Sequence, residues 1–219
     1  MSALATSVQD HEAHDHTGLS LSPAAQLRAN RLGLWLFCVS EIFLFVALLA
    51  ARFYLWRDTA GATVRPDLDQ LLGLVATSVL LLSSYFMVRA ETAIAHNERG
   101  KFGNSLLLTF ILGALFLVGV VGFEWGVFGI ELGGHTALKL TDGAFGAVFY
   151  AMTGMHALHV LTGLIFILLV WRNGRRGGYS AESHWGVEAC AIYWHYVDVV
   201  WVFFYPTLYL IGHVVGAHG

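Results

Sequence analysis

Charged side chains are scarce in this sequence, and that scarcity decides the class of protein. Asp, Glu, Lys and Arg make up 12% of the 219 residues, whereas 57% of the residues are hydrophobic and the mean hydropathy is +0.64. Soluble globular domains carry about 25% charged and about 45–50% apolar residues. The composition therefore argues against an ordinary soluble domain and indicates a membrane protein. The net charge of −3 gives no basis for a nucleic-acid partner.

Cysteine is also scarce, which excludes two further classes. Cys38 and Cys190 are the only cysteines, and both fall in apolar runs. They provide no disulfide framework and no cysteine-based metal spacing. The N-terminal residues lack the basic start and apolar core of a signal peptide. We therefore expect the first apolar segment itself to direct insertion into the membrane.

Long apolar runs are what the chain has in abundance. A spanning helix needs about 20 mostly apolar residues, and five runs meet this requirement. They cover residues 31–56, 71–90, 105–130, 144–171 and 185–212. The sequence thus predicts an all-α, polytopic membrane protein with five transmembrane helices in a single domain, residues 30–219, joined by loops too short for a soluble domain.

The first 29 residues are polar and contain three histidines, His11, His14 and His16. These histidines allow loose metal binding, but their polar setting favours a flexible tail.

Basic residues give the expected orientation. Positive charge favours the cytoplasmic side of a membrane. Eight of the 12 Lys and Arg residues flank one side of the expected spans, including Arg172, Arg175 and Arg176 after the fourth span. The sequence therefore predicts the N-terminus inside and the C-terminus outside.

The candidate site residues are ionisable groups inside the expected spans. They are Glu41, His156, His159, Glu188, His195 and Asp198. Such groups are rare and costly in a membrane, and they mark a functional site or a buried polar contact. At a rise of about 1.5 Å per residue, several of them reach the midplane of a hydrocarbon core about 30 Å thick. His195 and Asp198 are three residues apart, so they share one face of a helix.

Several chemistries are compatible with these groups. Mid-membrane histidines on facing helices would allow haem ligation, but the paired Glu-x-x-His motifs of a di-iron bundle are absent. A chain of acids and histidines can also relay protons. The pattern favours a structural polar network with no metal site and no catalytic residue in this chain. We expect His195 and Asp198 to point together into the bundle, with His156 or His159 as their further partners.

Four stretches resemble one family in the same order along the chain. YWHYVDVVWVFFY is similar to a signature of subunit III of haem-copper oxidases, the cytochrome c oxidase type. RLGLWLFCVSEIFLF, TDGAFGAVFYAMTGMHALHVLTG and HWGVEACAIYWH are similar to three further segments of that family. The resemblance covers residues 31–213, and five helices match the shorter bacterial members. Ala157 departs from the glycine that many members have between the two histidines.

This resemblance implies a function that composition does not. It implies subunit III of an aerobic terminal oxidase in a bacterial plasma membrane, itself non-catalytic and free of haem and copper. The partner subunits would carry those cofactors. The chain would pack on subunit I, bind phospholipid between helices, and support proton uptake and catalytic durability. Glu41 would be the family's intramembrane carboxylate, known for its reaction with carbodiimides.

Three interpretations stay open from the sequence. Besides the cytochrome c oxidase subunit, the chain could serve a quinol oxidase or act as an accessory protein of a nitric oxide reductase. A stand-alone membrane metalloenzyme is a third interpretation. Four residues are candidate lipid contacts under the first interpretation. They are Arg52, Trp56, Trp194 and Trp201.

Overall fold

The computed structural model describes residues 22–59, 70–125 and 143–210, and every regular element within them is helical. Five α-helices and two short π-helical segments follow one another. They are α1 (Pro23–Thr59), α2 (Gln70–Ala95), α3 (Arg99–Val118), η1 (Gly119–Glu124), α4 (Gly143–Arg175), α5 (Trp185–Tyr205) and η2 (Pro206–Leu210). Five helices are long and apolar enough to cross a membrane. For the described residues, the predicted all-α class and the prediction of five helices able to span a membrane are confirmed.

The first helix begins earlier than the sequence predicted. It starts at Pro23, so residues 23–29 are helical although they were assigned to the tail. Proline suits the first helical position because it needs no backbone donor there, and the backbone N–H of Ala25 donates to Ser22 Oγ at 3.3 Å. The tail histidines lie outside the described residues.

The last helix changes its winding at its only proline. The α-helical pattern of α5 ends at Tyr205, and the π-helical segment η2 begins at Pro206. Proline has no backbone N–H and therefore cannot continue the ladder of α-helical hydrogen bonds.

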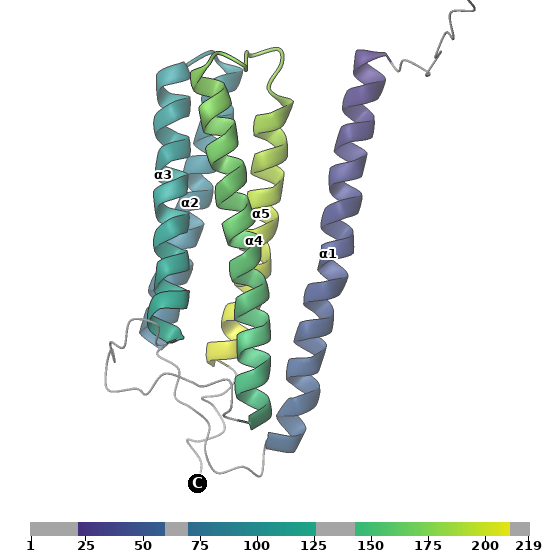
Figure 1. Cartoon of the computed structure of the whole chain (residues 1–219), viewed down its shortest axis with the longest axis vertical. Helices are drawn as coiled ribbons and strands as arrows, with labels where there is room; N and C mark the ends of the chain where they lie inside the picture. Colours follow the sequence, from purple (N-terminus) through teal and green to yellow (C-terminus); the bar gives the residue numbers. More distant parts are fainter. Residues whose placement is uncertain (1–21, 60–69, 126–142, 211–219) are drawn as a thin grey trace, which may run out of the picture.

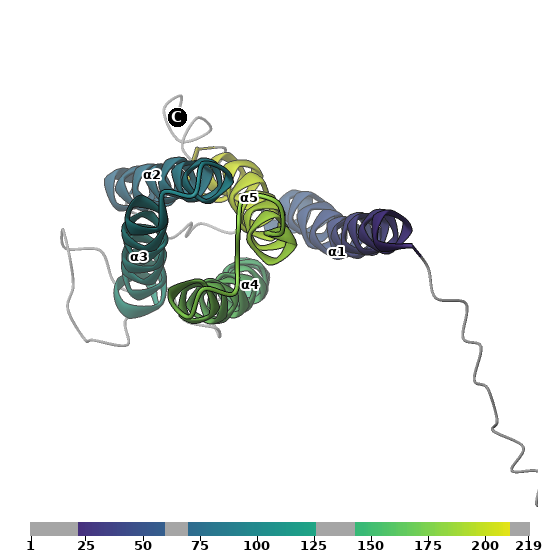
Figure 2. The ribbon, with the colours of Figure 1, turned by 90° about the horizontal axis from the view of Figure 1, so that it is seen from above.

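Four of the five helices form a ring. α2 contacts α3, α3 contacts α4, α4 contacts α5, and α5 contacts α2, so the four stand around a common core when seen from above (Figure 2). α1 lies outside this ring beside α5 and contacts α4 and α5 (Figures 1 and 2).

A buried tryptophan that packs against two glycines occupies the centre of the ring. Trp194 on α5 is fully buried and lies between Gly113 on α3 and Gly163 on α4. A Cβ atom at Gly113 would come within 2.5 Å of the indole ring, and one at Gly163 within 2.9 Å. Because any side chain larger than hydrogen would clash there, these glycines allow the three helices to pack closely around the ring.

Candidate functional site

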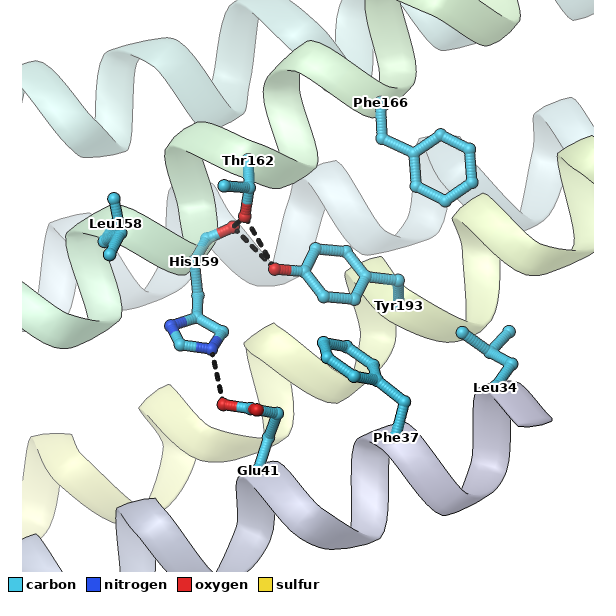
Figure 3. Close-up of a pocket in the computed structure, with 8 residues that line it drawn as sticks. All are labelled: Leu34, Phe37, Glu41, Leu158, His159, Thr162, Phe166 and Tyr193. Carbon is cyan, nitrogen blue, oxygen red and sulfur yellow. Dashed lines mark hydrogen bonds and ion pairs between the residues drawn. The ribbon is translucent and has the colours of Figure 1, made fainter. Parts of the chain in front are cut away.

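A groove opens where α1 meets the ring of four helices. It encloses about 430 Å³ between α1, α4 and α5. Figure 3 shows the residues around it. They are Leu34, Phe37 and Glu41 from α1, Leu158, His159, Thr162 and Phe166 from α4, and Tyr193 from α5. The groove is thus largely apolar, with one acid and one imidazole in its wall.

Glu41 and His159 face each other across this groove. His159 Nε2 lies 3.2 Å from Glu41 Oε2 (Figure 3), and its other nitrogen, Nδ1, lies 2.8 Å from the carbonyl oxygen of Met155. A carbonyl accepts only, so Nδ1 must carry a hydrogen. A hydrogen bond between Nε2 and the carboxyl therefore needs one further proton, carried either by the acid or by Nε2.

Neighbouring groups fix the orientation of this pair. The Phe45 ring of α1 lies edge-on to the His159 ring, with 4.8 Å between their centres. The Tyr193 hydroxyl lies 2.7 Å from Thr162 Oγ1 and donates to the carbonyl oxygen of His159 at 3.2 Å. The pair thus joins α1 to α4, while Tyr193 joins α5 to the same turn of α4.

His195 and Asp198 form a separate cluster, and their partner is Ser84 on α2. The Ser84 hydroxyl donates to Asp198 Oδ2 in a short hydrogen bond and lies 2.7 Å from His195 Nδ1. Asp198 is 4% exposed. The expectation that His156 or His159 would complete this cluster was wrong, because the helix rotations turn α5's acid toward α2.

His156 lies among aromatic rings instead. It is fully buried, its ring stacks on Trp201 with 4.9 Å between centres, and Phe116 packs edge-on against it at 5.7 Å. Within the described residues, neither ring nitrogen has a hydrogen-bond partner. His156 is therefore not linked to the other polar groups of the spans by a hydrogen bond.

Glu188 belongs to a third cluster, at the start of α5. Arg31 of α1 donates to Glu188 Oε2 at 2.6 Å and lies over the Trp185 ring, 5.8 Å from its centre. His184 Nε2 lies 3.6 Å from the other carboxylate oxygen. The residues proposed as one network thus lie in separate clusters that join different helices.

Two of the four residues predicted to contact lipid are buried in the structure, so the prediction for them was wrong. Trp194 and Trp201 are both 0% exposed. Their indole nitrogens donate to Ser83 Oγ and Thr77 Oγ1 on α2, each at 3.0 Å. Each indole therefore finds its polar partner inside the ring, and neither faces lipid.

The other two candidate lipid contacts lie on α1. Arg52 is 5% exposed, so it too is buried within the chain. The side chain of Trp56 lies outside the described part.

Sequence reasoning missed Ser84, Thr162 and Tyr193, which complete the polar clusters. The available signal was the pair Ser83–Ser84 in the middle of a span with no other polar residue between Ser78 and Arg89 except Tyr85. Hydroxyls can bond within their own helix, and Ser83 does so with Leu80. The pattern alone therefore did not reveal that Ser84 bonds to another helix.

No cluster of three or more His, Cys, Asp or Glu that could hold a metal ion occurs among residues 22–59, 70–125 and 143–210.

Comparison with known proteins gives the same family that the sequence motifs resemble. A family described as cytochrome c oxidase subunit III matches residues 20–213. Cytochrome c oxidase subunit 3 of Synechocystis sp. is 36% identical over 204 residues, which cover 91% of this chain and 80% of the relative. The subunit 3 of Thermostichus vulcanus is 31% identical, with 94% of each chain covered. That of Mus musculus is also 31% identical, over 83% of this chain and 69% of the relative.

Proposed function

Because this chain belongs to the cytochrome c oxidase subunit III family, we propose that it is a non-catalytic subunit of an aerobic terminal oxidase that packs on subunit I. On this proposal the partner subunits hold the haem and copper, and this chain holds neither. The names of the similar proteins favour cytochrome c over quinol as the electron donor. The observation that carries the proposal furthest is the groove with its acid–imidazole pair.

The groove suits the acyl chain of a phospholipid. Its volume of about 430 Å³ falls within the range of about 300–1,000 Å³ that is typical of small-molecule sites. Leu34, Phe37, Leu158 and Phe166 offer it apolar surface from α1 and α4. An acyl chain in this position would fill the space between α1 and the ring, and so would hold α1 at a defined distance.

The Glu41–His159 pair suits a supporting role in proton uptake. The two groups lie 3.2 Å apart, close enough to share one proton, and the Glu41 side chain is 24% exposed toward the groove. A proton can therefore be held between two groups without leaving a net charge in hydrocarbon, which would be costly. The proposed role is to sustain proton delivery to the catalytic subunit, and thereby its durability during turnover.

The basic residues support the proposed location. We propose a bacterial plasma membrane with the N-terminus of this chain inside and its C-terminus outside. Arg172 and Arg175 lie in the last turn of α4, and Arg31 pairs with Glu188 at the start of α5. Basic residues at this end of the bundle support the proposal that it is the cytoplasmic end.

The proposal is tested by comparing the oxidase with and without this chain. We expect oxidase depleted of the chain to begin oxygen reduction at nearly the normal rate and to lose activity after fewer turnovers. Adding back the wild-type chain should restore its durability. Immediate and complete loss of oxygen reduction in the depleted, otherwise intact oxidase would show that the chain is catalytic.

A further inference from the structure

Glu41 uses only one of its two carboxyl oxygens. Its Oε2 lies 3.2 Å from His159 Nε2, whereas Oε1 has no hydrogen-bond partner within the described part of the chain. Oε1 is not a buried atom, and the Glu41 side chain is 24% exposed in the wall of the groove (Figure 3). One oxygen of the carboxyl is therefore open to the molecule that fills the groove.

The hydrogen bond to His159 determines the character of Oε1. His159 Nδ1 carries a hydrogen, since it faces the carbonyl oxygen of Met155, so the bond between Nε2 and Oε2 needs one hydrogen on either of these two atoms. A hydrogen on Oε1 instead would leave two lone pairs facing each other across 3.2 Å. A further hydrogen would leave a net charge in hydrocarbon, which is costly. Oε1 can therefore only accept, and its partner in the groove must donate.

No side chain in the wall of the groove supplies this donor. Thr162 Oγ1 donates to the carbonyl oxygen of His159 at 2.9 Å, and the Tyr193 hydroxyl donates to the same oxygen at 3.2 Å. The Tyr196 hydroxyl has no partner within the described residues, but it is buried and Tyr196 does not line the groove. The donor must therefore come from a bound molecule.

The depth of Glu41 limits which molecule can supply the donor. Glu41 is ten residues from Arg31, which pairs with Glu188 at the start of α5, so it lies about 15 Å further along α1. In a hydrocarbon core about 30 Å thick, this position is close to the middle. An acyl chain carries no donor at this depth, and a charged head group is too costly to bring there. The molecule therefore needs a small, uncharged head with a hydroxyl group.

The walls of the groove favour an aromatic head on an apolar chain. Phe37 of α1 stacks on Tyr193 of α5 with 6.3 Å between ring centres, and Phe166 of α4 lines the same groove (Figure 3). Aromatic rings pack favourably on one another in offset or edge-on arrangements. Leu34 and Leu158 add aliphatic surface for a chain. An aromatic ring with a hydroxyl donor and an apolar tail matches each of these features.

We propose that the groove binds a lipid-soluble quinol whose hydroxyl donates to Glu41 Oε1 and whose ring packs against Phe37 and Phe166. Its apolar tail takes the place of the acyl chain in the groove. This inference rests on the proposed function, because it assigns a ligand to the same groove. The quinol is a bound ligand beside the Glu41–His159 pair and is distinct from the electron donor of the oxidase.

A matched pair of ligands tests the hydrogen bond without altering the protein. A quinol with a photoreactive group on its alkyl chain is bound to the purified oxidase, and its adducts are located by mass spectrometry. We expect adducts on α1 and α4 of this chain. Unlabelled quinol should displace the probe at a roughly threefold lower concentration than its dimethyl ether, whose oxygens cannot donate. Equal displacement by the two, displacement by phospholipid at an equally low concentration, or adducts only outside α1, α4 and α5 would overturn the proposal.

Variants of Glu41 test the acceptor itself. Glu41→Gln can donate an amide hydrogen to His159 Nε2 and leaves its oxygen for the ligand, whereas Glu41→Leu removes the acceptor. We expect the quinol to bind the Gln variant like wild type and the Leu variant roughly threefold more weakly, while the dimethyl ether binds both equally. Arg31→Gln is the control, because it weakens the other link of α1 and leaves the carboxyl in place. An equal loss in Arg31→Gln, or equal binding of the quinol to the Gln and Leu variants, would contradict the proposed bond.

These outcomes separate the inference from the function. If the wild-type chain co-purifies with a haem-bearing subunit but the quinol does not label the groove, the inference fails and the function stands. If the quinol labels the groove while the chain co-purifies with no haem-bearing subunit, the proposed function fails and the bound ligand stands.

Discussion

The fifth helix and the first are both long and apolar enough to cross a membrane, yet they are placed differently. In the most apolar stretch of α5, 61% of the residues are buried inside the chain, against 11% in α1. Trp194, Trp201 and Phe204 on α5 are fully buried, whereas α1 exposes Leu36 by 60% and Phe43 by 71%. α5 is therefore part of the core, and α1 is attached to the core from outside.

The two helices are also held by different forces. α5 is held by close packing around its tryptophans and by hydrogen bonds to α2. α1 depends on a few side chains, among them Glu41, Arg31 and the buried Phe45. A change on α5 should thus affect the whole bundle, and a change on α1 should affect mainly the position of that helix.

The largest expected effect is at Trp194. Trp194→Ala removes a fully buried indole and its bond to Ser83, and such changes cost about 3–5 kcal/mol. We expect a lower thermal unfolding midpoint for the chain in detergent and a smaller folded fraction in size-exclusion chromatography. Phe203→Ala on the same helix is the control, because Phe203 is 60% exposed. Equal effects of the two substitutions would contradict the assignment of Trp194 to the core.

The next effect concerns the buried acid of α5. Asp198→Leu leaves the Ser84 hydroxyl without its carboxylate acceptor, and unsatisfied buried groups cost about 1–3 kcal/mol. Asp198→Asn keeps an acceptor oxygen for Ser84. We expect the Leu variant to be depleted from the purified oxidase and the Asn variant to be retained, as measured by quantitative immunoblotting. If Leu is retained as well as wild type, the cluster does not hold α5 against α2.

A smaller and more local effect is expected on α1. Glu41→Leu removes the link to His159, whereas Glu41→Gln keeps a hydrogen-bonding group; interhelical bonds in membranes contribute about 0.6 kcal/mol. Spin labels at Phe43 on α1 and Leu115 on α3 report the distance between α1 and the ring. We expect a broader distance distribution for the Leu variant than for the Gln variant.

The control for that experiment lies within the ring. Labels at Val88 on α2 and Leu115 on α3 should give the same distribution in both Glu41 variants. Broadening of both label pairs would show that α1 is an integral part of the core, and would remove the contrast between α1 and α5.

The smallest effect lies at the exposed start of α3, where Glu98 precedes the helix and Lys101 lies in its first turn. Lys101 donates to Glu98 at 2.8 Å, and this bond lowers the pKa of the exposed Glu98 carboxyl. Because the folded-state pKa is lowered, the stabilisation is present above the ordinary pKa of glutamate and is lost as the pH falls through the lowered value. Lys101→Gln should raise the pKa of Glu98, measured by NMR with ¹³C-labelled glutamate, with little change in stability since the pair is exposed. An unchanged titration would refute this bond.

The five spans were predictable from the sequence because length and hydropathy alone determine whether a helix can cross a membrane. Glu41, His159, His195 and Asp198 could be picked out as candidate site residues for a related reason, since ionisable groups stand out against an apolar background. The early start of α1 at Pro23 was not predictable, because the first turns of this helix are polar and carry no hydropathy signal.

The pairing of the polar groups was not predictable from the sequence. Spacing along one helix shows which residues share a face, but the rotation of that helix against its neighbours depends on packing throughout the bundle. For this reason the sequence did not show that Asp198 pairs with Ser84, or that His156 lies among aromatic rings. Similarly, spacing showed that Trp194 and Trp201 share one side of α5, but only the packed bundle shows that this side faces the core.

Native mass spectrometry of the oxidase, purified in mild detergent through a tag on this chain, tests the central claim most directly. We expect a complex in which this chain accompanies a haem-bearing subunit and phospholipid. On gentle dissociation the chain should leave without haem or copper, while the haem stays with its partner. Recovery of the chain alone with tightly bound haem, or with no haem-bearing subunit at all, would contradict the account.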